Sequence, residues 1–94
     1  MSAKLITKDK KYFPDGSFME IIIWLVKPNV RASHHEYKYR MAYIENNVCV
    51  IRYDNEAGKG DHKHINSVEI ATKFISISQL YDDFIADIQT YRGR

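Results

Sequence analysis

The chain has 94 residues, which is the size of one small domain. Hydrophobic residues make up 45% of it and charged residues 28%, and this ordinary globular composition argues against disorder. The net charge of +2 is too weak for a histone-like or polybasic protein. There is no apolar run of membrane-spanning length and no hydrophobic leader, and a lone Cys excludes an internal disulfide framework. We therefore expect one soluble, cytoplasmic domain over residues 1–94, away from membranes.

The first predicted element is a β-hairpin. Two segments, Leu5–Phe13 and Phe18–Val26, flank a Pro-Asp-Gly sequence, in which Pro presets φ and Gly accepts a positive φ. The second segment carries apolar side chains on both faces. We therefore expect a central strand that is covered on both sides, with Trp24 in the core.

Two more predicted strands follow a polar loop. In Glu36–Ile44, alternate positions carry Tyr or Met, and this period of two indicates a half-buried strand whose aromatic face packs under a helix. The Asn46-Asn47 pair predicts a tight hairpin turn, because Asn tolerates the left-handed conformation. Val48–Tyr53 is the returning strand.

Residues Asp54–Ser67 are predicted to form a long loop. Ala57 and Ile65 supply the only apolar side chains of this segment. Loops of this length in a small domain are usually functional or disordered, which makes the segment the first place to look for a site. A last strand, Val68–Ile75, is expected to follow it.

The C-terminal segment predicts an amphipathic helix. Ser76 and Gln79 match a capping box, and the residues after them repeat at helical spacing. The apolar stripe consists of Ile77, Leu80, Tyr81, Phe84, Ile85, Ile88 and Tyr91. The predicted fold is therefore α+β, with a single-layer, meander-like antiparallel sheet of about five strands packed against this one helix.

Titratable side chains are concentrated between residues 52 and 64, and they suit ribonuclease chemistry. A metal-free ribonuclease needs a base for the 2′-OH, an acid for the leaving 5′-oxygen and a cation for the phosphorane. The catalytic candidates are His62 and His64 as base or acid, Asp61 as a carboxylate that orients an imidazole, and Lys59 as the cation. We expect His64 to be the more exposed proton carrier, because it lies beyond the Gly-Lys-Gly turn.

Further side chains near this segment are candidates for binding a substrate. Arg and Lys bind phosphate, an aromatic ring beside a polar loop can stack on a base, and an imidazole can reach the site from a neighbouring strand end. Asp54, like Asp61, can orient an imidazole. The binding candidates from the residues themselves are Arg40, Arg52, Tyr53, Lys63 and His35.

Two other interpretations of the segment stay open. His62-x-His64 resembles half of a metal site, to which Asp54, Asp61 or His34 could add a ligand, and the protein would then be a metal-dependent phosphodiesterase. Alternatively, the loop docks phosphate or an acidic protein surface without catalysis. Since no further ligands stand at a recognisable spacing, we expect no metal and no cofactor.

Residues Tyr53–Ile65 resemble the signature of the TumE-type toxin family of bacterial toxin–antitoxin pairs. They read Tyr-Asp-Asn-Glu-x-Gly-Lys-Gly-Asp-His-Lys-His-Ile. Other family features recur in order, so that the resemblance covers nearly the whole chain. They are Asp15-Gly16 before a strand ending Ile23-Trp24-x-Val26, then His35-x-Tyr37-Lys38-Tyr39-Arg40, and finally Phe74-x-Ser76-x-x-Gln79-Leu80-x-x-Asp83-Phe84-x-x-Asp87-Ile88.

The resemblance implies a small cytoplasmic toxin that acts as a ribonuclease and is encoded beside a helix-turn-helix antitoxin. By motif match it draws attention to Asp54, Asn55, Lys59, Gly60, Asp61, His62 and His64, and it adds Asp54 and Asn55 to the binding candidates. The expected partners are RNA and the cognate antitoxin. We also expect that the chain can form a homodimer, because a domain this small buries only ~60–65% of its unfolded surface and gains stability from a partner. Together, residues and resemblance predict a metal-independent endoribonuclease.

Overall fold

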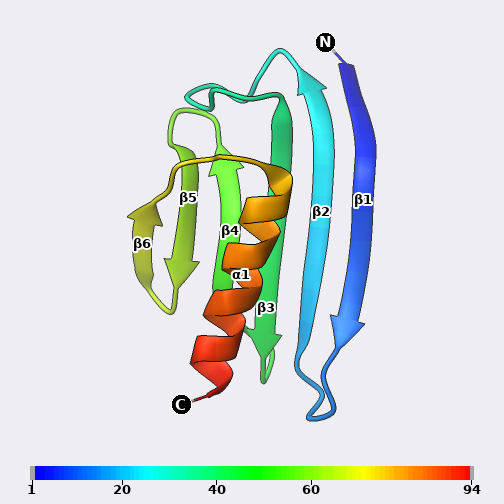
Figure 1. Ribbon diagram of the computed structural model, residues 1–94, viewed down its shortest axis with the longest axis vertical. Helices are drawn as coiled ribbons and strands as arrows, with labels where there is room; N and C mark the ends of the chain where they lie inside the picture. The colour runs from blue at the N-terminus through cyan, green and yellow to red at the C-terminus, as the bar shows by residue number, and fades with distance from the viewer. Residues whose placement is uncertain (1, 94) are drawn as a thin grey trace.

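Six antiparallel strands form one sheet, and one helix lies across one of its faces (Figure 1). The computed structural model describes residues 2–93. Its elements are β1 (Ser2–Tyr12), β2 (Phe18–Lys27), β3 (Tyr37–Glu45), β4 (Val48–Glu56), β5 (Gly60–Ile65), β6 (Val68–Ala71) and α1 (Ile77–Arg92). Each strand pairs with the next in chain order. The predicted α+β meander with a C-terminal helix is thus confirmed, with six strands where about five were expected.

The hairpin turns form where Gly and Asn supply a positive φ. Gly16 has a φ of 89° between β1 and β2, and Asn46 and Asn47 have φ values of 51° and 64° between β3 and β4. Asn66, with a φ of 56°, turns the chain from β5 into β6. Other residue types rarely adopt this conformation, so the turn chemistry of the sequence sets where the strands reverse.

The structure corrects the loop predicted at Asp54–Ser67. Most of this segment is a β-hairpin, made of the end of β4 and of β5. Gly60 is needed in it, because a Cβ there would lie 2.7 Å from the carbonyl oxygen of Ala32. The apolar alternation that marks a strand is missing, since polar side chains occupy both faces of this hairpin. The final strand is also shorter than predicted and ends at Ala71.

The core lies between the sheet and α1. The aromatic face predicted for β3 does pack under the helix, and Tyr43 of that strand and Phe84 of the helix are both fully buried. Buried core residues of the sheet are Met19, Ile21, Ile23, Tyr39, Met41, Tyr43, Val50, Ile51 and Tyr53, and those of the helix are Leu80, Phe84 and Ile88. Burial of such side chains is the main force that holds the two layers together.

Both ends of α1 are fixed by side chains. Ser76 caps the first turn as predicted, because its Oγ accepts a hydrogen bond from the backbone N–H of Gln79 at 3.0 Å. In the last turn, Arg92 donates to the hydroxyl of Tyr43 at 2.8 Å and to Asp15 at 3.2 Å. The helix is thereby fastened to the turn between β1 and β2. Within the described residues, no helix is long and apolar enough to cross a membrane.

The second face of the sheet, which we call the open face, is covered by no helix or further sheet among residues 2–93 (Figure 1). Strand β2 is therefore covered on one side, which corrects the expectation of cover on both. Trp24 is half-buried on the open face, opposite Leu5 of β1 and Lys38 of β3, and it is not part of the core.

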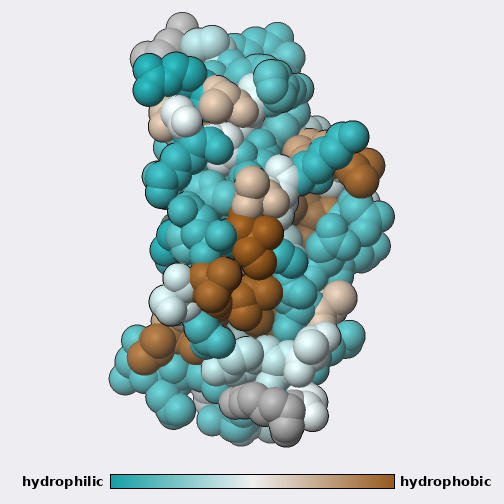
Figure 2. Space-filling model, turned by 90° about the vertical axis from the view of Figure 1, so that its left-hand side faces the viewer, coloured by the Kyte–Doolittle hydropathy of each residue, from teal (hydrophilic) through white to brown (hydrophobic). Residues whose placement is uncertain are grey.

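The edge of the sheet at β6 exposes apolar side chains. Val68 is 58% exposed and Ile70 is 42% exposed. Figure 2 faces this side of the molecule and shows apolar side chains gathered near the middle of a largely polar surface. This edge strand pairs with β5, which carries polar side chains including His62 and His64.

Candidate active site

Charged side chains form a band across the open face from β3 to β6. The strand register sets them side by side, with Arg40 opposite Asp54, Asp54 opposite His62, and Arg52 opposite His64. Because successive residues of a strand point to opposite faces, every second residue of these strands shares the open face. The hairpin of β4 and β5 thus sets both imidazoles beside Asp54 and Arg52, while Arg40 faces Asp54 from β3.

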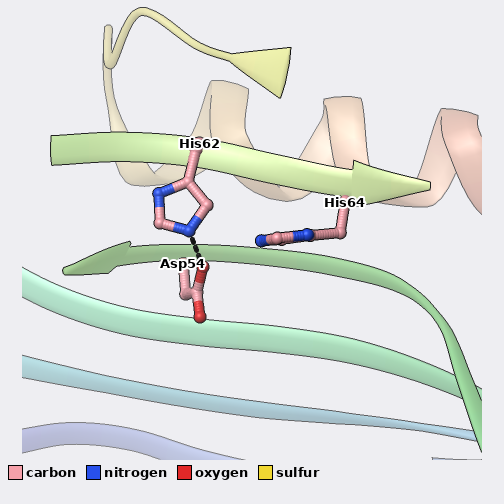
Figure 3. Close-up of side chains that lie close together, drawn as sticks. All are labelled: Asp54, His62 and His64. Carbon is pink, nitrogen blue, oxygen red and sulfur yellow. Dashed lines mark ion pairs between the residues drawn. The ribbon is translucent and has the colours of Figure 1, made fainter. Parts of the chain in front are cut away.

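Three of these side chains converge at the centre of the band (Figure 3). The Nε2 atom of His62 lies 2.8 Å from Oδ1 of Asp54. The rings of His62 and His64 lie 5.1 Å apart between their centroids. The side chain of His62 is 3% exposed and that of His64 is 24% exposed. His64 is therefore the more accessible imidazole, as the sequence predicts.

The backbone selects the tautomer of His62. Its Nδ1 lies 3.0 Å from the carbonyl oxygen of Gly60, which can only accept a hydrogen bond, so Nδ1 carries a hydrogen. The neutral ring then keeps a lone pair on Nε2. Oδ1 of Asp54, Nε2 of His62 and Nε2 of His64 are all buried atoms without a hydrogen-bond partner. Such atoms are rare in folded proteins and point to a catalytic role or a bound ion.

Two glutamates and a lysine border the imidazoles. Oε1 of Glu69 lies 3.6 Å from Nε2 of His62 and 3.5 Å from Nε2 of His64, and Oε1 of Glu56 lies 3.7 Å from Nε2 of His62. Lys59 contacts Glu69 at 3.2 Å, and this hydrogen bond raises the pKa of Lys59 and lowers that of Glu69. A hollow of about 240 Å³ opens between Lys59, His62 and Glu69.

Positive charge lies on the other side of Asp54. Nε of Arg52 is 3.1 Å from Oδ2 of Asp54, and Arg40 is exposed on the neighbouring strand. A cleft of about 820 Å³ borders this part of the sheet, and its walls include Lys38 and Glu56. Glu56 therefore belongs both to the cleft and to the surroundings of His62.

Asp61 belongs to a second cluster, on the helix face of the sheet. It accepts hydrogen bonds from Ser33 Oγ at 2.8 Å, His35 Nε2 at 2.8 Å and the hydroxyl of Tyr39 at 2.7 Å. Nδ1 of His35 accepts from the backbone N–H of Tyr37 at 3.1 Å, so both ring nitrogens are used internally. Burial and the contact with Asp61 raise the pKa of Tyr39. The cluster is a closed structural network.

This placement corrects two expectations for the site. Asp61 cannot orient the imidazole of His62, because the two residues are neighbours in a strand and point to opposite faces. His35 does not join the two imidazoles of β5 either. Its ring stacks on that of Phe74, with 3.8 Å between the centroids, and its Nε2 faces Asp61.

Three of the predicted binding residues likewise lie on the helix face. Asn55 is 3% exposed, and its side chain accepts a hydrogen bond from the backbone N–H of Tyr39 at 3.1 Å. Tyr53 is 2% exposed and donates to Asp87 of the helix, and Lys63 contacts Asp87 at 3.0 Å. Burial raises the pKa of Tyr53. These contacts tie β4 and β5 to α1 and to the loop before β3, so their geometry is structural.

The sequence matches the family model described as toxin TumE over residues 2–92. The chain belongs to the toxin TumE family. It is therefore a toxin of a toxin–antitoxin system, and the family implies a cognate antitoxin as its partner. No curated protein and no solved structure matches the chain. The matched range contains both the open-face band and the Asp61 cluster.

Two residues of the candidate site, Glu56 and Glu69, are not among the candidates that the sequence patterns predict. The sequence does carry a signal that would place Glu69. The two residues Asn66-Ser67 are typical of a hairpin turn, and such a turn pairs the strand residues on either side of it. Counting back and forward from that turn sets Glu69 opposite His64, as the structure has it.

The open face of the toxin holds the kinds of group that acid–base chemistry on a phosphodiester requires. An imidazole side chain is a common general acid or base, and Oδ1 of Asp54, 2.8 Å from Nε2 of His62, would stabilise an imidazolium at that position. Arg40, Arg52 and Lys59 supply positive charge around them. The same three central side chains, Asp54, His62 and His64, are also the residues that could hold a metal ion.

Proposed function

We propose that this toxin is an endoribonuclease that cuts RNA on its open face by metal-independent acid–base chemistry. The observation that supports it most is the pair of imidazole Nε2 atoms, on His62 and His64, that have no hydrogen-bond partner and lie beside a carboxylate. In the Asp61 cluster, by contrast, both nitrogens of His35 are occupied. On the open face, the Nε2 atoms instead face carboxylates, that of Asp54 for His62 and that of Glu69 for both imidazoles.

In the proposed reaction, the 2′-oxygen of RNA attacks the adjacent phosphorus. An imidazole takes the 2′-OH proton as the O2′–P bond forms, and the other gives a proton to the 5′-oxygen as the P–O5′ bond breaks. The products are a 2′,3′-cyclic phosphate and a 5′-hydroxyl. His64 is the better candidate for direct contact with RNA, because it is 24% exposed, and the ion pair of His62 with Asp54 supplies the second proton site.

The basic side chains are proposed to bind the phosphates. Arg52 lies on β4, the strand next to the imidazoles, Arg40 lies opposite Asp54 on β3, and Lys59 lies at the turn before β5. A guanidinium group binds a phosphate with two parallel hydrogen bonds and stabilises the charge that grows on the phosphorane. The cleft of about 820 Å³ that Lys38 and Glu56 help to line is proposed to hold a neighbouring part of the RNA strand.

Two further partners are part of the proposal. The antitoxin is proposed to be a helix-turn-helix protein, in line with the family resemblance. A homodimer is proposed because both edges of the sheet, β1 and β6, are exposed along their whole length, and an unpaired strand edge can pair with another chain. Light scattering on the purified toxin measures the mass of the assembly; a monomer at every concentration would contradict the dimer.

The test is RNA cleavage by purified toxin with a labelled oligonucleotide. Wild type is expected to yield 2′,3′-cyclic phosphate ends, visible by mass spectrometry, and a 2′-deoxy substitution at the cut site is expected to stop cleavage. The variants His62→Ala and His64→Ala should lose activity, while His34→Ala, in an exposed loop, serves as the matched control. Full cleavage by both site variants would refute the acid–base assignment. Salt-sensitive RNA binding without any cleavage would show a non-catalytic binding module instead.

A further inference from the structure

We infer that Asp54, His62 and His64 form a binding site for one divalent transition-metal ion, with Zn²⁺ as the best-fitting ion. The ligand atoms would be Oδ1 of Asp54 and the two Nε2 atoms, which lie within 4.8 Å of one another. Each of these atoms is buried and has no hydrogen-bond partner. One ion at their centre would satisfy all three at once.

The burial of His62 makes this more than a chance cluster of polar groups. Its side chain is 3% exposed, and its Nε2 faces Asp54. A hydrogen on Nδ1 is held by the carbonyl oxygen of Gly60 at 3.0 Å, which leaves the lone pair of Nε2 free for a metal. A backbone carbonyl that fixes the tautomer of a ligating imidazole is a common feature of metal sites.

The spacing of the ligand atoms suits a tetrahedral ion. Bonds of about 2.0–2.2 Å to Zn²⁺ set two ligand atoms roughly 3.3 Å apart. Asp54 Oδ1 and His62 Nε2 are 2.8 Å apart, and no pair among the three exceeds 4.8 Å, so small side-chain rotations reach the required geometry. The fourth position falls to water or to Glu69, whose Oε1 lies 3.6 Å and 3.5 Å from the two Nε2 atoms.

The chemistry of the ligands selects the class of ion. Two imidazole nitrogens and one carboxylate oxygen favour Zn²⁺ and its first-row neighbours, whereas Mg²⁺ and Ca²⁺ prefer a shell of oxygens. Two of the nearby carboxylates are paired with cations, Glu69 with Lys59 at 3.2 Å and Asp54 with Arg52 at 3.1 Å.

Binding of the ion has a consequence for the chemistry of the toxin, which rests on the proposed function. A metal on His62 and His64 takes the same lone pairs that proton transfer needs. Zn²⁺ would therefore act as a reversible inhibitor of RNA cleavage, and removal of the ion would release the two imidazoles for catalysis.

The direct test is metal binding by the toxin without RNA. After treatment with a chelator and dialysis, calorimetry with Zn²⁺ is expected to give one site per chain, and Co²⁺ is expected to give the intense visible absorption of a tetrahedral complex. Asp54→Asn and His64→Ala should weaken binding by more than the roughly 10- to 100-fold that loss of an outer-shell partner costs. His34→Ala, whose side chain lies in the exposed loop before β3, should bind as wild type does.

Circular dichroism of each variant establishes that it is folded. The fold should tolerate a substitution of His64 better than one of His62, because His64 is less buried. The inference is overturned if folded wild-type toxin takes up no Zn²⁺ or Co²⁺, or if His64→Ala binds with unchanged affinity. Cleavage assays separate this outcome from the proposed function. If the toxin binds no Zn²⁺ but cleaves RNA in the presence of a chelator, the metal site is refuted and the proposed function is not. If the toxin binds one Zn²⁺ and needs it for cleavage, the metal site is supported and the metal-free mechanism is refuted.

Discussion

Replacement of Asp61 tests whether the two faces of the β4–β5 hairpin have separate roles. Its carboxylate is 8% exposed and accepts three hydrogen bonds of 2.7–2.8 Å, from Ser33, His35 and Tyr39. A hydrogen bond to a charged group contributes about 1.5–3 kcal/mol. Since the three share one carboxylate and do not add fully, Asp61→Ala should lower the free energy of unfolding by about 3–6 kcal/mol.

That loss is a large part of the total for a chain of this size, which is about 5–14 kcal/mol. Urea unfolding, followed by the fluorescence of the single Trp24 and by circular dichroism, measures it. Asp61→Asn keeps one acceptor oxygen and should cost about half as much. Asp82→Ala, on the exposed side of the helix, is the control and should stay within about 0.5 kcal/mol of wild type.

The reasoning predicts that the folded fraction of Asp61→Asn cleaves RNA at nearly the wild-type rate. Two results would refute it. The first is an Asp61→Ala protein as stable as wild type, which would mean that the hydrogen-bond network on the helix face contributes little. The second is a stable, folded Asp61→Asn protein with a severe catalytic defect, which would return Asp61 to the catalytic role that the sequence suggested.

Two further predictions concern RNA binding and acid stability. Arg40→Ala and Arg52→Ala should each weaken RNA binding. In each variant, the slope of log affinity against log salt concentration should become shallower by about 0.7, as expected for the loss of one phosphate contact. An unchanged slope would contradict phosphate binding by that arginine. The hydrogen bonds from Ser17 and the charge of Arg92 hold the pKa of Asp15 below its ordinary value of 3.8. The stability that Asp15 adds is therefore fully present above pH 3.8 and is lost as the pH falls through the lower pKa of the folded state. In urea titrations at a series of pH values, the free energy of unfolding of Asp15→Asn should fall less steeply at acid pH than that of wild type. An equally steep fall would contradict this.

The sequence predicts the helix and most of the strands because each has a local cause. The period of two in β3, the Ser76 cap and the Asn46-Asn47 turn all act within a few residues, and the structure contains each of them. The prediction fails at β5. This strand is polar on both of its faces, so its residues carry no apolar alternation, and a rule based on hydrophobicity takes it for a loop.

That one error explains why the candidate site was only half predicted. In a loop, Asp61, His62 and His64 can all converge on one point, and the sequence offers no reason to separate them. In a strand, Asp61 must point away from the other two, toward the helix face. The pairing of His64 with Glu69 of β6 depends on the register of the last hairpin, and the apolar pattern of the sequence does not determine that register.

The central claim is that the imidazoles of the open face carry the protons in RNA cleavage, and the single-turnover cleavage rate of His64→Ala tests it most directly. General acid–base catalysis contributes about 10²- to 10⁴-fold, so the rate should fall by that factor in a protein that is folded and still binds RNA. His34→Ala, the exposed control, should cleave at the wild-type rate. Cleavage by His64→Ala at the rate of wild type would contradict the account.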